Sequence, residues 1–209
     1  MKIVVVTNDG LKEELLEQGL KGSPEIEWLN DINAIPGHAD AYIDLLFDRD
    51  RNKRKEILDK LNAEVIIIND VIETTETLSR NFVRINGWPT FLKRKTAEAS
   101  CNNEQIKSKT EEVLDYFNKK IEWTQDIPGF VTARVVSTIV NEAYFSLEDE
   151  VSSRGEIDEA MKLGTGYPYG PFEWSKLIDI KNIYSLLDNL SKKNKRYAAS
   201  GLLQKEATI

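Results

Sequence analysis

The chain is short of cysteine and histidine, with one of each among its 209 residues. Cys101 alone cannot form an internal disulfide or a metal cluster, and we expect a reducing, cytoplasmic setting and no bound metal. No stretch approaches the ~20 consecutive apolar residues that cross a bilayer, so no membrane partner is expected. The chain has 28 Lys and Arg residues and 35 Asp and Glu residues, which gives a net charge of -7. This negative charge argues against nucleic acid as a partner.

The composition is otherwise that of an ordinary soluble globular protein, with 41% hydrophobic and 30% charged residues. Disordered and fibrous classes are therefore excluded. A chain of this length buries enough surface for one large domain or two modest ones.

Short apolar runs alternate with helical patterns up to about residue 125. The runs are typical of strands in a mainly parallel sheet covered on both faces, because they are continuously apolar and separated by helices. We predict strands at 3–6, 26–29, 41–47, 65–68 and 82–85, and helices at 11–20 and 53–61.

Strand patterns stop after residue 125. Apolar residues at i, i+4 spacing predict one long amphipathic helix over 130–148, and further helices are predicted over 157–162 and 183–190. The sequence therefore predicts an α/β domain at 1–125 and an all-helical domain at 126–209.

Several motifs in the helical part occur in a fixed order. They are Asp-Ile-Pro-Gly-Phe at 126–130, Asn-Glu-Ala at 141–143, Ile-Asp at 157–158 and Gly-Tyr-Pro-Tyr-Gly-Pro-Phe-Glu at 166–173. This order resembles the C-terminal domain of the 3-hydroxyacyl-CoA dehydrogenase family. Upstream, 39–48 and 63–70 are similar to two strands of the same family, so that the resemblance covers roughly 39–204.

The resemblance implies a fold, an activity and a partner. The fold would be a truncated Rossmann-like, mainly parallel sheet followed by an all-helical domain of the 3-hydroxyacyl-CoA dehydrogenase C-terminal type. The activity would be NAD-linked oxidation of a 3-hydroxyacyl-CoA in fatty-acid metabolism, and the helical domain would form a homodimer. The long helix carries apolar residues beyond one stripe, which suits a helix covered on two sides.

The phosphate-binding loop that a dinucleotide needs is reduced in this chain. A Rossmann fold places G-x-G-x-x-G between its first strand and helix, whereas 7–14 reads Thr-Asn-Asp-Gly-Leu-Lys-Glu-Glu and keeps only Gly10. Asp9 and Glu13 suit the first turn of a helix but would repel a pyrophosphate. Asp31 is the remaining candidate for the ribose hydroxyls. We therefore expect no cofactor, and NAD enters by family resemblance only.

The general base of the family is also replaced. Its His is followed by an orienting Glu twelve residues later, and Asn86 and Glu98 stand at these two positions. An amide cannot accept a proton at neutral pH, so Asn86 could bind a substrate oxygen but not drive its oxidation. Without the imidazole, Glu98 reads as a surface or strand-end carboxylate or as a base acting alone.

The resemblance places other residues at a substrate cleft. Asn69 aligns with a polar turn, and Trp88 could cover an acyl chain. The turn in the helical domain contributes Tyr167, Gly170, Pro171 and Phe172, although glycines and prolines that fix a loop also explain its retention.

Three functions remain open. The leading one is a catalytically degenerate 3-hydroxyacyl-CoA dehydrogenase-like protein, a pseudoenzyme that could still bind an acyl-CoA. The second is an active NAD-linked 3-hydroxyacyl-CoA or 3-hydroxybutyryl-CoA dehydrogenase with a rebuilt site. The third is a structural or regulatory dimer.

Overall fold

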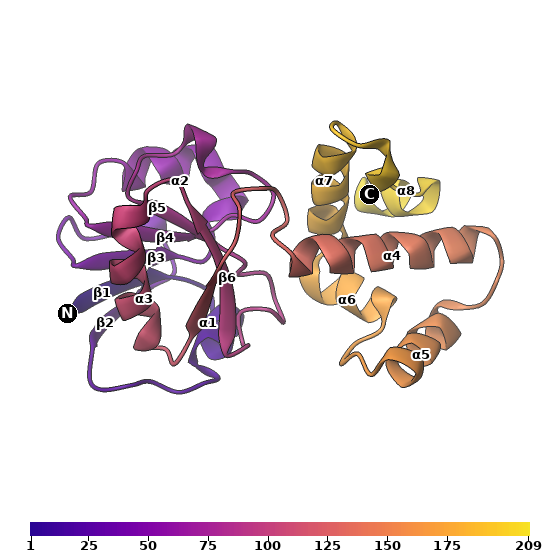
Figure 1. Ribbon diagram of the computed structural model, residues 1–209, viewed down its shortest axis with the longest axis horizontal. Coiled ribbons are helices and arrows are strands. Elements are labelled where there is room, and N and C mark those ends of the chain that lie inside the picture. Colours follow the sequence, from indigo (N-terminus) through magenta and orange to yellow (C-terminus); the bar gives the residue numbers. More distant parts are fainter. The chain divides into compact units, whose positions relative to one another are not determined.

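The computed structural model describes residues 1–209, which divide into two compact units, Met1–Phe130 and Val131–Ile209. Figure 1 shows the first unit as a sheet with helices around it and the second as helices only. No helix is both long and apolar enough to cross a membrane.

A seven-stranded sheet forms the first unit, in the order β2-β1-β3-β4-β5-β6-β7. The strands are β1 (Lys2–Val6), β2 (Glu25–Leu29), β3 (Ala41–Asp44), β4 (Val65–Asn69), β5 (Phe82–Ile85), β6 (Thr96–Cys101) and β7 (Lys120–Trp123). All neighbours pair in parallel except β5 and β6, which are antiparallel. The prediction of a mainly parallel, Rossmann-like sheet is confirmed.

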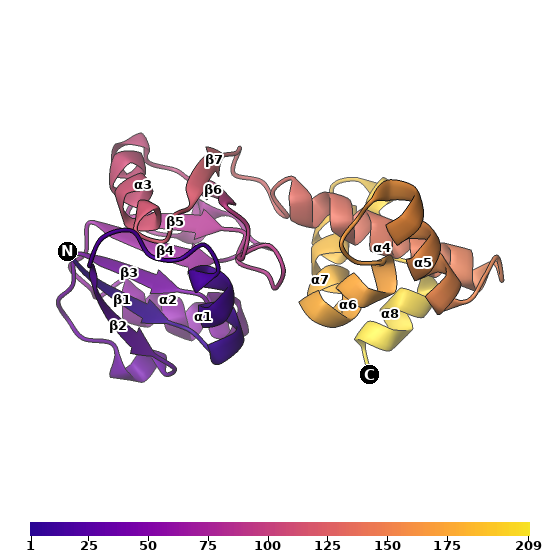
Figure 2. The same cartoon turned by 90° about the horizontal axis from the view of Figure 1, so that it is seen from below.

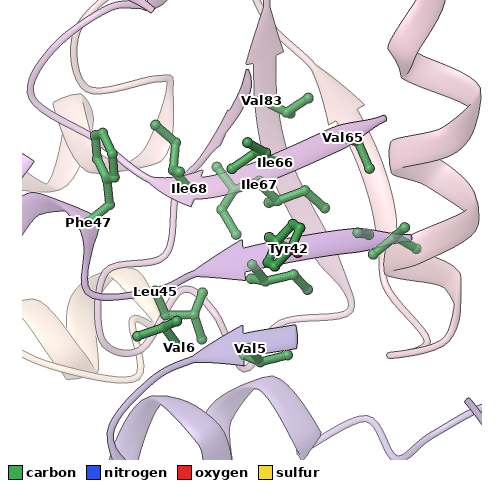
Figure 3. Close-up of a cluster of buried hydrophobic side chains, with 14 of the residues drawn as sticks. Val5, Val6, Tyr42, Leu45, Phe47, Val65, Ile66, Ile67, Ile68 and Val83 are labelled. Carbon is green, nitrogen blue, oxygen red and sulfur yellow. The ribbon is translucent and has the colours of Figure 1, made fainter. Parts of the chain in front are cut away.

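The central strands are apolar at successive positions because both faces of the sheet are covered. Every residue of β3, β4 and β5 is buried, and Figure 3 shows side chains of β1, β3 and β4 packed together. Burying one such aliphatic side chain stabilises the fold by about 1.5–3 kcal/mol. Continuous hydrophobic runs are therefore the sequence signal of these centrally placed strands.

Three helices accompany the strands of this unit: α1 (Asp9–Leu16), α2 (Arg51–Leu58) and α3 (Lys107–Asp115). Helix α3 lies in the foreground of Figure 1, and it packs on β7 and β4. Short 3-10 turns connect the rest, namely η1 (Ile32–Ala34), η2 (Phe47–Asp50), η3 (Thr75–Thr77) and η4 (Glu104–Ile106). The predicted strand 41–47 is too long, because Asp44 accepts a hydrogen bond from the Leu46 amide and turns the chain into η2.

Helices alone build the second unit: α4 (Thr132–Glu148), α5 (Arg154–Thr165), α6 (Pro171–Ile178), α7 (Ile180–Ser191) and α8 (Gly201–Ala207), with η5 (Lys195–Tyr197). Helices α6, α7 and α8 pack on α4, as Figure 2 shows from a second direction. The all-helical prediction is confirmed.

Local signals set the ends of α5. Ser153 and Glu156 form a capping box at its start, and Gly166 ends it in the left-handed conformation. Helix α6 begins at Pro171, inside the motif 166–173 that was interpreted as a turn fixed by glycines and prolines, because the fixed φ of proline suits the first helical position.

Candidate functional site

The carboxyl ends of the parallel strands form the edge where doubly wound folds bind their ligands. The order of the strands in the sheet reverses at β1, because β2 lies on one side of β1 and β3 lies on the other. The segments that follow these strands therefore make the candidate site of the sheet unit.

The start of α1 is closed by the chain itself. The Asn8 carboxamide oxygen accepts a hydrogen bond from the Leu11 amide at 2.9 Å, and Asp9 places a carboxylate in the first turn. A Cβ added to Gly10 would meet only Asn8 Oδ1, at 3.8 Å, an ordinary contact. Nothing here requires a glycine, and the helix start presents negative charge where a pyrophosphate would need donors.

Asp31 lies just beyond the carboxyl end of β2, where the resemblance places a ribose-binding carboxylate. Its Oδ1 accepts hydrogen bonds from the Asn33 amide at 3.0 Å and the Asn33 side chain at 2.7 Å. These bonds lower the pKa of Asp31, the backbone bond contributing most. The carboxylate caps η1, and its place at the end of β2 is compatible with either role.

Acidic and basic side chains gather after β3 and β4. Arg54 donates to both carboxylate oxygens of buried Asp44, at 2.7 and 2.8 Å, and Arg51 pairs with Asp70 at 2.8 Å. Burial, assisted by the charge of Asp70, raises the pKa of Asp48 to about 6. Nowhere in the chain do three or more His, Cys, Asp or Glu side chains gather as ligands for a metal ion.

Asn69 joins the ends of three neighbouring strands. Its side-chain oxygen accepts from the Gly87 amide at 3.0 Å, and its nitrogen donates to the Leu45 carbonyl at 3.2 Å. A Cβ at Gly87 would come within 2.9 Å of Asn69 Cγ, so only glycine fits without a shift. The Asn69 side chain therefore holds backbone in place at the position where the resemblance expects contact with substrate.

The structure brings Asn86 and Glu98 together, at the two positions that the resemblance assigns to the base and its orienting Glu. They face each other across β5 and β6: Asn86 Nδ2 donates to Glu98 Oε2 at 2.9 Å, and the Asn86 amide donates to the Glu98 carbonyl at 3.1 Å. Glu98 is thus half-buried on β6, inside the sheet and not at a strand end. An amide oriented by a carboxylate can offer hydrogen bonds, but it has no basic nitrogen.

Trp88 follows this pair directly. Its side chain is 1% exposed, and its indole N–H has no hydrogen-bond partner in the chain. Buried donors without a partner are rare in native structures. The Thr90 hydroxyl in the same segment is likewise buried without a partner.

A carboxylate from α1 anchors the segment after Trp88. Both oxygens of Glu14 accept from the Thr90 amide, at 2.8 and 2.9 Å, and one accepts from the Lys93 amide at 3.3 Å. The backbone of Thr90 has φ 76°, a left-handed conformation that residues other than glycine rarely adopt. Contacts with the surrounding structure must hold it there. Sequence reasoning assigned Glu14 only to the helix, because a contact between residues so far apart leaves no local pattern.

A buried arginine ties the segment 126–130 to the sheet. Arg84 on β5 is 0% exposed and donates to Asp126 Oδ1 at 2.9 Å and to the carbonyls of Asp70 at 2.8 Å and Ile127 at 3.1 Å. Its guanidinium also lies 4.6 Å from the centre of the Phe130 ring. The charged residue inside an otherwise apolar strand was a signal that could have identified this network.

The turn of the helical unit is held by two carboxylates. Asp158 accepts from the Phe172 amide at 2.7 Å, and a Cβ on Gly170 would lie 2.3 Å from Asp158 Oδ1. Glu173 accepts from the Gly170 amide at 2.9 Å and pairs with Lys162 at 2.5 Å. These contacts, with Pro171 at the first position of α6, explain the glycine and the proline structurally.

An aromatic group lies beside this turn. The rings of Tyr167 and Tyr169 lie 5.4 and 6.2 Å from the Trp174 ring. Tyr167 is 37% exposed, whereas Trp174 is buried with its indole N–H unpaired. Trp88 and Asn69 belong to the sheet unit, and Tyr167, Gly170, Pro171 and Phe172 belong to the helical unit.

Comparison with known proteins identifies one family. A family model described as the C-terminal domain of 3-hydroxyacyl-CoA dehydrogenase matches residues 129–207. The 3-hydroxyadipyl-CoA dehydrogenase of Escherichia coli (strain K12) is 35% identical over 115 residues, which are 54% of this chain and 24% of that protein. The 3-hydroxybutyryl-CoA dehydrogenase of Clostridioides difficile is 39% identical over 80 residues, 37% of this chain and 28% of that protein. The matched stretch thus spans about a quarter of these curated relatives.

Solved structures extend the likeness over the whole chain at the level of fold. M. tuberculosis FadB2 has a TM-score of 0.75 at 14% identity, covering 99% of this chain and 93% of that one. The 3-hydroxybutyryl-CoA dehydrogenase from Escherichia coli K12 has a TM-score of 0.61 at 30% identity, covering 69% of this chain and 32% of that one.

Proposed function

Because the chain belongs, through residues 129–207, to the 3-hydroxyacyl-CoA dehydrogenase family, we propose that it is an acyl thioester-binding relative of these enzymes without their redox step. The proposal has two parts, the loss of the proton acceptor together with the cofactor site, and the retention of thioester binding. Each part is supported by different residues.

The Asn86–Glu98 pair carries the first part. The bond of 2.9 Å between Asn86 Nδ2 and Glu98 Oε2 keeps the spacing of a base and its orienting carboxylate. General-base catalysis contributes typically 10²- to 10⁴-fold in rate, and an amide at this position supplies none of it. Glu98 already accepts the amide bond, so it is not a ready substitute.

The start of α1 supports the loss of the cofactor. The family is NAD-dependent, yet here Asn8 caps the helix and Asp9 follows it. A carboxylate at a helix start takes the favourable position that a phosphate would occupy. The start of α1 and the Asn86–Glu98 pair both argue against the redox step, because the first lacks the usual groups for binding the hydride carrier and the second lacks a proton acceptor.

The unpaired Trp88 indole supports retained ligand binding. A thioester carbonyl is a hydrogen-bond acceptor, and it would satisfy this buried donor at the position where the resemblance expects the substrate. Glu14 anchors the neighbouring segment and so keeps Trp88 in one place. This favours binding, because less conformational freedom is lost when a ligand binds.

The test is an absorbance assay of NADH consumption with acetoacetyl-CoA. We expect no protein-dependent turnover by the wild-type chain or by Asn86→His, because restoring the imidazole leaves the helix start unchanged. The matched control is Asn81→His, at a half-buried position just before β5 whose side chain donates to the Ala63 carbonyl. Turnover by wild type would favour the second candidate, an active dehydrogenase, and turnover by Asn86→His alone would show that the cofactor still binds.

We further propose a homodimer through the helical unit. Helix α4 buries Val136 and Val140 but leaves Val135 49% and Phe145 38% exposed, so it has apolar residues on a second face that another copy would cover. Light scattering should give twice the chain mass, and Val135→Glu should give a monomer. Val151→Glu, in the exposed turn after α4, is the control, and a monomeric wild type would refute the dimer.

A further inference from the structure

A cavity of about 230 Å³ lies within the helical unit, between α4 and η5. The residues that line it are Arg134, Val135, Thr138, Ile139, Arg196 and Tyr197. Pockets for drug-sized ligands measure about 300–1,000 Å³, so this one is smaller. A water molecule takes up about 30 Å³ of liquid, and the cavity therefore has room for about eight groups of that size. It fits a small ligand and is too small for a nucleotide.

The charged part of the lining is positive. Arg134 and Arg196 are the two charged residues of the cavity, and no Asp or Glu lines it. The Thr138 hydroxyl donates to the Arg134 carbonyl at 2.9 Å and is thus used within α4. Three further lysines lie in the range 192–195, directly before Arg196. In a chain with a net charge of -7, this local excess of positive charge favours an anionic ligand.

The remaining lining is mainly apolar. Val135 and Ile139 contribute aliphatic side chains from α4, and Tyr197 contributes an aromatic ring from η5. Both guanidiniums lie over that ring, Arg196 at 4.9 Å and Arg134 at 5.7 Å from its centre. A guanidinium that covers a ring keeps N–H donors at its edge, where a carboxylate can accept from them. The cavity thus combines positively charged donors with an apolar wall.

The segment that carries Arg196 is fixed against α4. Asn141 on α4 is buried, its Nδ2 donates to the Ala198 carbonyl at 2.9 Å, and its Oδ1 accepts from the Ser200 amide at 2.9 Å. Asn194 Oδ1 accepts from the Arg196 amide at 3.1 Å and so caps η5. These bonds hold the two sides of the cavity together before a ligand enters. A preformed site favours binding, because less conformational freedom is then lost.

We propose that this cavity binds a small carboxylate with an aliphatic chain of about six carbons. The carboxylate accepts from the guanidiniums of Arg134 and Arg196, whose planar forks match carboxylate geometry. The aliphatic chain lies against Val135, Ile139 and Tyr197, where it leaves water. The thioester position of the proposed function belongs to the sheet unit, whereas this cavity belongs to the helical unit. The carboxylate site therefore goes beyond the proposed function and does not depend on it.

The length of the aliphatic chain and the charge of the head group set the expected affinities. Each methylene that the cavity takes out of water should strengthen binding up to about fourfold. Affinity should therefore rise from acetate through butyrate to hexanoate, and it should not rise further at octanoate, whose chain exceeds the cavity. Loss of one charge-assisted hydrogen bond weakens binding about tenfold or more.

The experiment titrates the full chain, isotope-labelled, with sodium hexanoate and follows its amide signals by two-dimensional NMR. We expect signals of Arg134, Ile139 and Arg196 to shift and to saturate at millimolar hexanoate. Hexanamide has the same chain without the charge and should bind at least about tenfold more weakly. Hexanoate and hexanamide of equal affinity, or shifts that lie away from the cavity, would overturn the proposal.

A pair of neighbouring variants tests the arginine. Arg196→Gln should weaken hexanoate binding about tenfold. Lys195→Gln is the matched control, because Lys195 is an exposed cation beside Arg196 that does not line the cavity, and it should change the affinity less than about threefold. Equal effects of the two variants would show that only the general positive charge of the segment acts, and would refute the cavity as the site.

Light scattering in the same buffer separates the carboxylate from a second copy of the chain. Val135 also lies on the face of α4 where we propose that a second copy packs. We expect hexanoate to bind, and Arg196→Gln to keep the oligomeric state of the wild type. A wild-type dimer that does not bind hexanoate and that becomes monomeric with Arg196→Gln would show that the second copy fills the cavity, and would overturn the proposal. Failure of acetoacetyl-CoA to bind would refute the proposed function alone.

Discussion

Replacement of Arg84 by methionine tests the account of the segment that joins the sheet to the helical unit. The change removes the guanidinium that bonds Asp126 and the carbonyls of Asp70 and Ile127. Breaking a buried ion pair from one side costs about 3–5 kcal/mol. Asp126 is 24% exposed in its side chain and keeps bonds from Thr75 and Ser100, which places the expected loss near the lower end, about 3 kcal/mol.

Urea unfolding followed by tryptophan fluorescence measures this loss. Trp174→Phe as the common background leaves tryptophans only in the sheet unit, so the signal reports that unit. Arg80→Met, at an exposed position, should change stability by less than about 0.5 kcal/mol. A loss under about 1 kcal/mol for Arg84→Met would show that the Arg84 guanidinium does not hold the segment 126–130 to the sheet. Adding Asp126→Asn to Arg84→Met should recover part of the loss, since no unpaired charge then remains.

Three further predictions use the same assay. Glu14→Gln should lower stability by about 2 kcal/mol, because it weakens two charge-assisted bonds, whereas Glu13→Gln should not; equal effects would contradict the anchoring role. Gly87→Ala should lower stability by about 1–3 kcal/mol, because the new Cβ would clash with the Asn69 side chain. Gly10→Ala, inside α1, should raise stability by about 0.5–1 kcal/mol. A loss of stability at Gly10 would indicate that a glycine is required there. The pKa of Asp48 is about 6 in the folded chain and 3.8 in the unfolded chain. Its protonation therefore stabilises the fold fully below pH 3.8, and this stabilisation is lost as pH rises through 6. Asp48→Asn should gain about 2 kcal/mol on wild type as pH rises from about 4 to about 7.5, and a constant difference would contradict the burial of Asp48.

The sequence was sufficient where the period of the apolar residues was unambiguous. Strands β1 to β5 and helix α4 were predicted because fully buried strands read as continuous apolar runs and a one-sided helix reads as an i, i+4 stripe. The resemblance placed Asn86 and Glu98 at the positions of a base and its orienting carboxylate, but the sequence did not predict that these two side chains would bond to each other.

Other elements left weaker patterns. Strand β6 reads Thr-Ala-Glu-Ala-Ser-Cys and β7 has four residues, so neither has the apolar run that predicted the first five strands. Helix α6 begins inside a glycine- and proline-rich motif whose composition indicates a loop. The reach of Glu14 depends on contacts distant along the chain, which no local pattern encodes.

Two calorimetric titrations of the purified chain, one with acetoacetyl-CoA and one with NADH, test whether thioester binding is retained and the cofactor site is lost. We expect acetoacetyl-CoA to bind, and to bind more weakly to Trp88→Phe, which lacks the unpaired indole donor. We expect NADH not to bind. Micromolar binding of NADH would contradict it, because the capped, acidic start of α1 would then hold a pyrophosphate after all.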